Sequence, residues 1–314
     1  EGPVTDALRF DGVSKTFGAR RALDTLSFHI PRGSLAGFIG PNGAGKTTAF
    51  GVVGGFLEQD EGEIEVLGLD AFDPNALRGR LGVLPQDADL PPRHTAHEFL
   101  VHLALLQGMS WADAVVEAET RLSQVNLMER CRERIQALSH GMRRRVAVAS
   151  ALLGTPELVL LDEPMAGLDP VQAAGVRDVL QAMQGEATMV VSSHDLYELE
   201  RICDWVVMVD RGTLVRQGSV SDVTEQRRQA TWSLAAGDLK LDVLRDQLPN
   251  WEVTAAREAE GQQMMLRAPT DADLDAASVI VMQHLIACGI GVRGLQQGST
   301  LEASFVASTS RRFD

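Results

Sequence analysis

The sequence predicts an α/β fold built on a central, mostly parallel β-sheet. Runs that are apolar throughout alternate with longer stretches of helical period, at 158–161, 188–192 and 205–209. Such runs are typical of strands that are buried on both faces of a parallel sheet. Another apolar run at 35–39 leads directly into a glycine-rich loop and a first helical turn, which is the order of a phosphate-binding site. Residues 8–14 and 26–30 read as an antiparallel element ahead of this sheet.

A mainly helical segment interrupts the alternation at 95–131. Its apolar residues Phe99, Leu103 and Leu106 follow the i, i+4, i+7 spacing of one helix face. The segment lies between two strand-like regions. It therefore predicts a helical subdomain at about residues 90–150 of the first domain.

A second, smaller domain is expected after a polar and charged stretch at 218–229. We place the first domain at 1–220 and the second at 221–314. The elements of the second are, in order, a strand at 231–235, a helix at 239–248, a hairpin of strands 251–255 and 263–268 turning at Glu260-Gly261, a helix at 271–288 and a strand at 292–295. This β-α-β-β-α-β order predicts a small α+β domain of ferredoxin-like type.

The charge balance of the 314-residue chain limits the classes of partner that we expect it to bind. With 29 basic and 43 acidic residues, the formal net charge is −14, which argues against a nucleic-acid partner and against direct docking on an anionic lipid surface. The three cysteines, Cys131, Cys203 and Cys288, show no metal-binding spacing and read as reduced thiols of a cytoplasmic protein. The start at Glu1-Gly2-Pro3 lacks a signal pattern, and no apolar run is long enough to span a membrane.

One segment fits the phosphate-loop pattern G-x-x-x-x-G-K-[ST] at every position: Gly40, Pro41, Asn42, Gly43, Ala44, Gly45, Lys46 and Thr47. Glycines allow backbone N–H groups to approach phosphate oxygens, and the N-terminus of the following helix adds its positive end. Lys46 supplies a cation for the β- and γ-phosphates, and the Thr47 hydroxyl is a ligand for Mg²⁺. The pattern predicts a nucleoside triphosphate site.

Two carboxylates follow the buried run 158–161. Asp162 and Glu163 are expected at the carboxyl end of the strand, where open α/β sheets bind ligands. Adjacent side chains of a strand point to opposite sides, so the two acids take different roles. Asp162 suits the outer shell of Mg²⁺, and Glu163 suits polarisation of a water that attacks the γ-phosphate.

These motifs, with others in the same order over about residues 6–220, resemble the nucleotide-binding subunit of an ATP-binding-cassette (ABC) transporter. The resemblance implies the P-loop NTPase fold of ABC ATPases, ATP and Mg²⁺ as ligands, and ATP hydrolysis. It identifies residues 40–48, which include Thr48, as the Walker A loop. It identifies residues 158–163 as the Walker B strand. It also implies that Phe17 stacks on adenine and that Gln86 contacts Mg²⁺ and the attacking water.

The resemblance assigns three further positions. Ser139 and Gly141 match the signature motif and would reach a γ-phosphate, although His140 and Met142 depart from the usual LSGGQ pattern. Asp169 belongs to the D-loop, and His194 matches the switch histidine that follows a buried strand. The basic run 143–145 comes directly after the signature, near a helix start where cations are disfavoured, and we expect it to be a solvated face.

The resemblance also implies partners. The signature motif lies too far from its own phosphate loop to share a nucleotide, so two cassettes, identical or homologous, would enclose ATP head-to-tail. With one cassette and no span, the chain would work with separate polytopic permease subunits at the cytoplasmic face of the cell membrane. The end of the chain at 301–306 resembles that of exporter-type ATPases with a small α+β tail. That tail is either a dimerisation or regulatory domain, or a structural appendage.

Three alternatives stay open at this point. A soluble ABC ATPase of ribosomes or chromosomes predicts tandem cassettes, a coiled-coil insert or a basic face, none of which is visible in the sequence. A P-loop kinase or GTPase leaves the order of Gln86, Ser139 and His194 unexplained. A degenerate, purely regulatory cassette is disfavoured by the presence of Glu163 and His194.

Overall fold

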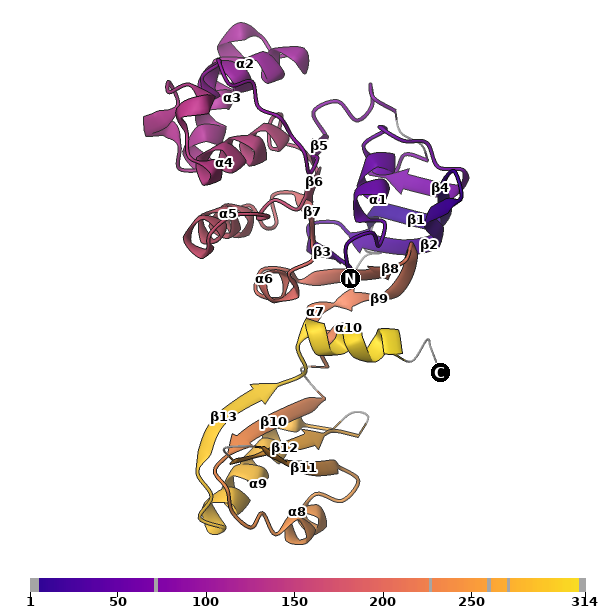
Figure 1. Cartoon of the computed structure of the whole chain (residues 1–314), viewed down its shortest axis with the longest axis vertical. Helices are drawn as coiled ribbons and strands as arrows, with labels where there is room; N and C mark the ends of the chain where they lie inside the picture. The colour runs from indigo at the N-terminus through magenta and orange to yellow at the C-terminus, as the bar shows by residue number, and fades with distance from the viewer. Residues whose placement is uncertain (1–5, 71–72, 226–227, 259–260, 270–271, 311–314) are drawn as a thin grey trace. The chain divides into compact units, whose positions relative to one another are not determined.

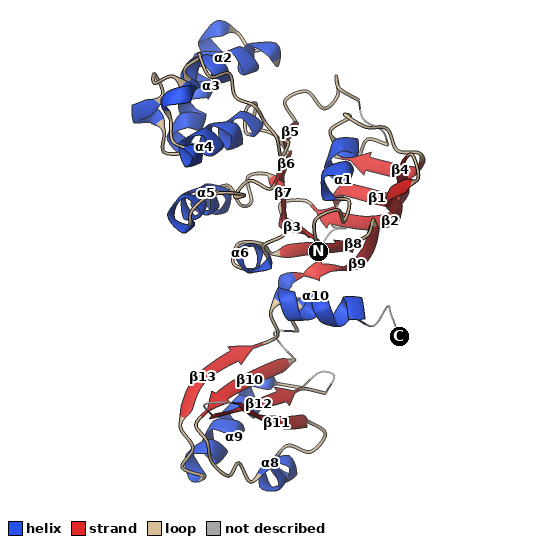
Figure 2. Cartoon of the chain, viewed as in Figure 1, coloured by secondary structure: helices blue, strands red, loops and turns tan. Residues whose placement is uncertain are grey.

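The computed structural model describes the chain over 6–70, 73–225, 228–258, 261–269 and 272–310. The predicted turn residue Glu260, the predicted helix start at Asp271 and the first residues Glu1-Gly2-Pro3 lie outside these ranges. By its internal contacts the chain divides into two compact units, Glu1–Gly218 and Ser219–Asp314. Figure 1 follows both from the indigo N-terminal strands to the yellow C-terminal helix, and Figure 2 separates helices from strands.

A six-stranded sheet of order β5-β6-β7-β3-β8-β9 forms the centre of the first unit (Figure 1). Its strands are β3 (Leu35–Ile39), β5 (Leu81–Leu84), β6 (Leu158–Asp162), β7 (Thr188–Ser193), β8 (Trp205–Asp210) and β9 (Thr213–Ser219). The pairs from β5 through β8 are parallel, and every residue of β3, β6 and β7 is buried. The predicted parallel sheet is confirmed, with the expected apolar runs at its centre.

A second sheet of this unit is antiparallel and has the order β2-β1-β4. It consists of β1 (Asp6–Phe17), β2 (Arg20–Pro31) and β4 (Glu61–Val66). Phe28 of β2 stacks on Phe10 of β1 at 4.5 Å between ring centroids and lies 5.3 Å from the ring of Phe38 in β3. These rings join the two sheets through a shared apolar core.

The helices of the first unit lie on both faces of the central sheet. Figure 1 shows α1 on one face and α4, α5 and α6 on the other. Their bounds are α1 (Lys46–Val53), α2 (Ala96–Leu106), α3 (Trp111–Gln124), α4 (His140–Ala151), α5 (Pro170–Ala182) and α6 (Leu196–Glu200), with short 3₁₀ turns at Met128–Arg130 and Ile135–Ala137. Thr95 and Glu98 form a reciprocal capping box that starts α2.

The spacing of Phe99, Leu103 and Leu106 does not mark the buried face of α2. Leu106 is 78% exposed, and Phe99 and Leu103 are only half-buried. Small residues on another face of α2 make the contact with α3 and α4, together with two larger ones: Ala96, Ala104, Leu100 and Val101 are the buried residues. Alanines allow the helices to approach closely, so packing partners rather than side-chain size select the buried face.

The second unit is an α+β domain with an antiparallel sheet of order β11-β12-β10-β13. Its elements are α7 (Val220–Val223), β10 (Gln229–Leu234), α8 (Leu241–Gln247), β11 (Glu252–Glu258), β12 (Gly261–Arg267), α9 (Leu274–Ala287), β13 (Val292–Gln297) and α10 (Leu301–Ser310). The core brings Trp232 and Met264 of the sheet against Leu244 of α8 and Leu285 of α9. The segment 301–306 begins α10, which packs on α7.

The structure offers no candidate for a membrane span. Within the described ranges, every helix is either too short or too polar to cross a bilayer.

Candidate functional site

The phosphate loop connects β3 to α1, as the sequence predicts. Gly43 has φ 83° and Gly45 has φ 105°, a region of backbone conformation in which a side chain is strained. Gly40 is required by space, because a Cβ there would lie 2.4 Å from the carbonyl oxygen of Val209. The loop therefore packs its backbone tightly against β8 and turns inward at the N-terminus of α1.

Lys46 is the first residue of α1, and its ammonium folds back over the loop. Its Nζ donates to the carbonyl oxygens of Gly40 at 2.7 Å and Pro41 at 3.4 Å. It also lies 3.6 Å from Glu163 Oε1, and each of the two side chains is 7% exposed. A cation held mainly by neutral carbonyl groups keeps its positive charge available to an anion.

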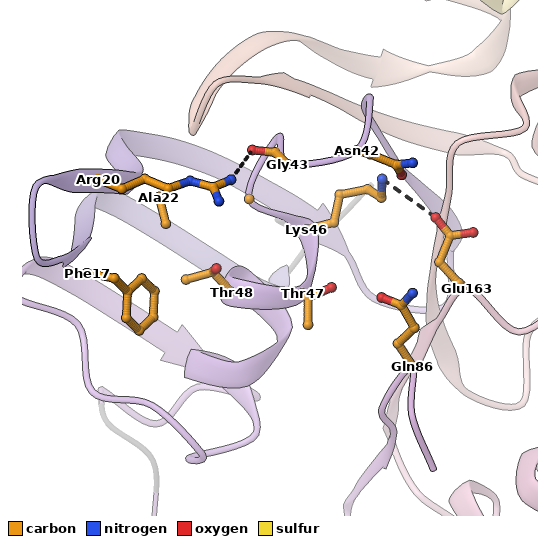
Figure 3. A pocket seen from close by; sticks show the side chains of 11 residues that line it. Phe17, Arg20, Ala22, Asn42, Gly43, Lys46, Thr47, Thr48, Gln86 and Glu163 are labelled. Carbon is orange, nitrogen blue, oxygen red and sulfur yellow. Dashed lines mark hydrogen bonds and ion pairs between the residues drawn. The ribbon is translucent and has the colours of Figure 1, made fainter.

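A cavity of about 530 Å³ opens along this loop (Figure 3). Phe17 lies at one end, and Glu163 and Gln86 lie at the other. The cavity is lined by Phe17, Arg20, Ala22, Asn42, Gly43, Gly45, Lys46, Thr47, Thr48, Gln86 and Glu163. Its residues come from β1, β2, the phosphate loop and the segments after β5 and β6, so the structure brings predicted residues from distant parts of the sequence together.

The edge of the parallel sheet explains this convergence. The phosphate loop, Gln86, Glu163 and His194 follow β3, β5, β6 and β7 in turn, and parallel strands end at the same edge. Gly40, Pro41 and Ala44 belong to the loop but are not among the residues that line the cavity. Ala44 is instead buried, with its methyl group near Gly40.

Asp162 and Glu163 point to different partners, as predicted. Asp162 Oδ1 accepts a short hydrogen bond from the Ser192 hydroxyl of β7, while Asp162 Oδ2 is buried without a hydrogen-bond partner among the described residues. The backbone N–H of Glu163 donates to Ser192 Oγ at 2.9 Å. Ser192 therefore orders both residues, a role that no motif in the sequence indicates.

Glu163 sits in a strained turn beside an imidazole. Its φ is 49°, in the left-handed region that non-glycine residues rarely adopt. Its carboxylate oxygens lie 3.0 and 3.1 Å from Nδ1 of His194. The His194 ring is 56% exposed, whereas the carboxylate is buried. The turn aims one carboxylate at both Lys46 and His194.

Ser139, Gly141 and Asp169 form a separate group at the starts of α4 and α5. Ser139 Oγ accepts from the N–H of Met142 at 3.3 Å, and Asp169 Oδ1 accepts from the first turn of α5. A Cβ at Gly141 would lie 2.7 Å from the side chain of Gln172 in α5, so a larger residue there would displace that side chain. None of the three lines the phosphate-loop cavity.

Arg20 is a cavity residue that the sequence reasoning missed. Its guanidinium donates to the carbonyl oxygen of Gly43 at 3.4 Å, between Phe17 and the phosphate loop (Figure 3). The next residue of the strand, Arg21, points to the opposite side and contacts Ser14, where its guanidinium donates at 3.0 Å. The alternation of a β-strand was the available signal, because it separates the two arginines.

The expectation that 143–145 is a solvated face is wrong. Each guanidinium donates to backbone carbonyl oxygens: Arg143 to Leu138, Arg145 to Val125, and Arg144 to Asp162, Glu163 and Pro164. Burial lowers the pKa of Arg144 and of Arg145. The arginines lie near the start of α4, yet they connect α4 to neighbouring loops, and these contacts were not visible in local sequence.

The fold and the site together define an ABC-type ATPase. Residues 23–166 match the family model described as "ABC transporter". The linearmycin resistance ATP-binding protein of Bacillus subtilis is 32% identical over 69% of this chain and 70% of its own length. The daunorubicin/doxorubicin resistance ATP-binding protein of Streptomyces peucetius is 29% identical over 99% of this chain and 94% of its own.

Solved structures agree in fold. A bacterial ABC transporter cassette solved as a dimer is 25% identical, with a TM-score of 0.61 over 68% of this chain and 98% of its own. A Clostridium perfringens cassette that is part of an ABC transporter complex has a TM-score of 0.64, at 23% identity, over 78% of this chain and 96% of its own. The chain therefore belongs to the ATP-binding proteins of ABC transporters and is an ATPase.

Proposed function

We propose that this chain powers export through separate membrane-spanning permease subunits, with Glu163 as the residue that activates water for ATP hydrolysis. The observation that carries the proposal is the convergence of Lys46 and His194 on the Glu163 carboxylate beside the phosphate loop. A buried carboxylate next to a phosphate-binding cation is placed to orient a nucleophile for in-line attack.

The order of residues along the cavity suits an extended nucleotide. Phe17 at one end is 46% exposed and offers a ring face for adenine. The loop amides and Lys46 hold the phosphates, and Thr47 and Thr48 line the same wall. Gln86 and Glu163 border the far end, where the γ-phosphate and the attacking water belong, and His194 orients the Glu163 carboxylate.

The residues present fit a magnesium ion. Asp162 Oδ2 is a buried carboxylate oxygen that no described residue hydrogen-bonds, and the Thr47 hydroxyl and Gln86 amide border the cavity. Within the described residues no cluster of three or more acids, histidines or cysteines surrounds them. That donor set suits Mg²⁺, which takes few protein ligands alongside substrate phosphates and water. Bound there, the ion would neutralise charge on the β- and γ-phosphate oxygens.

A second cassette completes the proposed site. Ser139, Gly141 and Asp169 lie at helix starts outside their own cavity, and their exposed N-termini suit an anion bound by another copy. The dimeric state of the cassette of similar fold supports this arrangement. ATP is then enclosed between the phosphate loop of one cassette and the Ser139 region of the next, and hydrolysis releases the pair.

Export is the direction that the relatives support, since they are named for drug resistance and, in the case of the Nod factor export ATP-binding protein I of Paraburkholderia xenovorans, for export. We assign residues 1–220 to the ATPase, held at the cytoplasmic face of the membrane by the permease. Residues 221–314 form an accessory domain, and the full-length match to the daunorubicin/doxorubicin resistance protein supports its presence in exporter ATPases.

The Glu163→Gln variant tests the catalytic assignment. We expect a loss of ATP turnover of about 10²-fold or more, because general-base assistance contributes that much, with ATP binding retained. We also expect an ATP-dependent dimer in light scattering after size exclusion. Glu186→Gln, in an exposed turn before β7, is the matched control with the same loss of charge. Undiminished turnover in Glu163→Gln would contradict the assignment.

A pull-down from detergent-solubilised membranes tests transport. Co-purification of a polytopic membrane protein in stoichiometric amount supports the permease partnership. Ribosomal material in its place would favour the soluble ABC ATPase, which is the second candidate function.

A further inference from the structure

One arginine connects the signature helix α4 to the turn that carries Glu163. Arg144 Nε donates to the carbonyl oxygen of Pro164 at 2.9 Å, and its Nη2 donates to those of Asp162 at 2.9 Å and Glu163 at 2.6 Å. Its Nη1 lies 3.4 Å from the carbonyl oxygen of Gln86. A single planar group therefore contacts both the Glu163 turn and the Gln86 segment.

The turn needs such a partner. Asp162, Glu163 and Pro164 are consecutive, and their carbonyl oxygens converge although the backbone of Glu163 is held at φ 49°. Three carbonyl dipoles pointing at one place repel one another unless a cation lies between them. A guanidinium has five N–H donors in a fixed plane, so it satisfies several acceptors at once, which an ammonium cannot do in the same geometry.

Arg144 donates these hydrogen bonds to main-chain oxygens although three carboxylates lie nearby. Desolvation lowers the pKa of its guanidinium, and the nearby Asp162, Glu163 and Asp87 carboxylates act in the opposite direction. The hydrogen bonds themselves go to main-chain oxygens, and Arg144 does not line the phosphate-loop cavity. Its influence on ATP therefore passes through the backbone of the residues it holds.

We propose that Arg144 is a positioning residue that fixes the Glu163 carboxylate for catalysis and couples it to the signature helix of the same chain. Arg144 lies on α4, five residues after Ser139 caps that helix. A shift of α4 when Ser139 engages the nucleotide of a partner cassette would move Arg144, and with it Glu163 and Gln86. The catalytic part of this role rests on the proposed function of Glu163.

The test is steady-state ATP turnover and ADP binding of Arg144→Ala and Arg144→Lys in the full chain. Misplacing a catalytic group by about 1 Å costs on the order of 10²-fold, so we expect kcat of Arg144→Ala to fall by about 30- to 100-fold. The ADP dissociation constant should stay within about two-fold. Arg144→Lys keeps the charge with fewer well-directed donors, and we expect it to retain about a tenth of the wild-type kcat.

The neighbouring arginines provide matched controls. Arg143→Ala and Arg145→Ala remove the same charge from the same helix, but their guanidinium groups donate to Leu138 and Val125, away from the Glu163 turn. We expect each control to keep kcat within about three-fold of wild type. A kcat for Arg144→Ala that equals those of the controls would overturn the inference.

A Glu163→Gln background separates positioning from general damage. If Arg144 acts through Glu163, adding Arg144→Ala to Glu163→Gln should lower the residual single-turnover rate by less than about three-fold. A full 30-fold further loss would instead show that Arg144 acts elsewhere. Should Arg144→Ala fail to fold, Arg144→Lys replaces it in both comparisons. Its kcat is compared with those of the Arg143 and Arg145 controls, and its effect is measured again in the Glu163→Gln background. Wild-type turnover in Glu163→Gln alone refutes the proposed function of Glu163, an outcome distinct from failure of the Arg144 comparison.

Discussion

Replacing Glu163 by glutamine should strengthen nucleotide binding as well as slow turnover. Lys46 Nζ lies 3.6 Å from Glu163 Oε1, and a bound β-phosphate competes with this carboxylate for the ammonium. Coulomb attraction at that separation is about 1 kcal/mol in a water-like dielectric and about 5 kcal/mol at an effective dielectric of 20. Both side chains are largely buried, so the desolvation cost of the pair offsets much of the larger value.

We therefore expect Glu163→Gln to bind ADP about ten-fold more tightly, or by about 1.4 kcal/mol. Isothermal titration with ADP avoids both hydrolysis and nucleotide-driven pairing of cassettes. AMP is the internal control, because its single phosphate does not reach the position of Lys46 between the β- and γ-phosphates, and its affinity should change by less than two-fold. Unchanged ADP affinity, or an equal gain for AMP, would refute the competition between Glu163 and phosphate.

Three further predictions concern the cavity and the core. Arg20→Ala should weaken ADP binding about five-fold, the effect of losing one exposed charged contact of about 1 kcal/mol, whereas Arg21→Ala should leave titrations unchanged. Gly82→Ala places a Cβ 1.8 Å from a carbonyl oxygen of α4, so thermal unfolding should show a loss of about 3 kcal/mol or more, against no loss for Gly175→Ala in open space. Chelation of Mg²⁺ should abolish hydrolysis, and Asp162→Asn should raise the Mg²⁺ concentration needed to restore it.

The parallel sheet was predictable because burial on both faces leaves a strong local signal. In β3, β6 and β7 each side chain is buried, so the strands appear in the sequence as apolar runs. The phosphate loop was predictable for a related reason. Gly43 and Gly45 adopt backbone conformations that few other residues tolerate, so the motif reflects a steric requirement of the loop itself.

Features that depend on distant contacts were not predictable. The exposed Leu106 and the buried Ala104 lie on the same helix, and only the positions of α3 and α4 decide which face is covered. The contacts of Arg144 were not predictable for the same reason, because its acceptors at Asp162 and Pro164 lie eighteen to twenty positions further along the chain. Local periodicity predicts that a segment is helical but does not predict which elements pack against it.

The chain has a formal net charge of −14, so the groups that hold the few cations around the cavity bear on how it binds an anion. Lys46, Arg20 and Arg144 each donate to main-chain carbonyl oxygens, at Gly40, Gly43 and the Glu163 turn. Carbonyl dipoles lower the cost of holding a cation in a partly buried place without neutralising its charge, whereas a carboxylate would cancel the field that attracts phosphate. Glu163 is the acidic residue among those lining the cavity, and it lies at the end opposite Phe17. Among the described residues, this acidic chain thus pairs its local cations with the backbone and keeps its carboxylates, except that of Glu163, off the cavity wall.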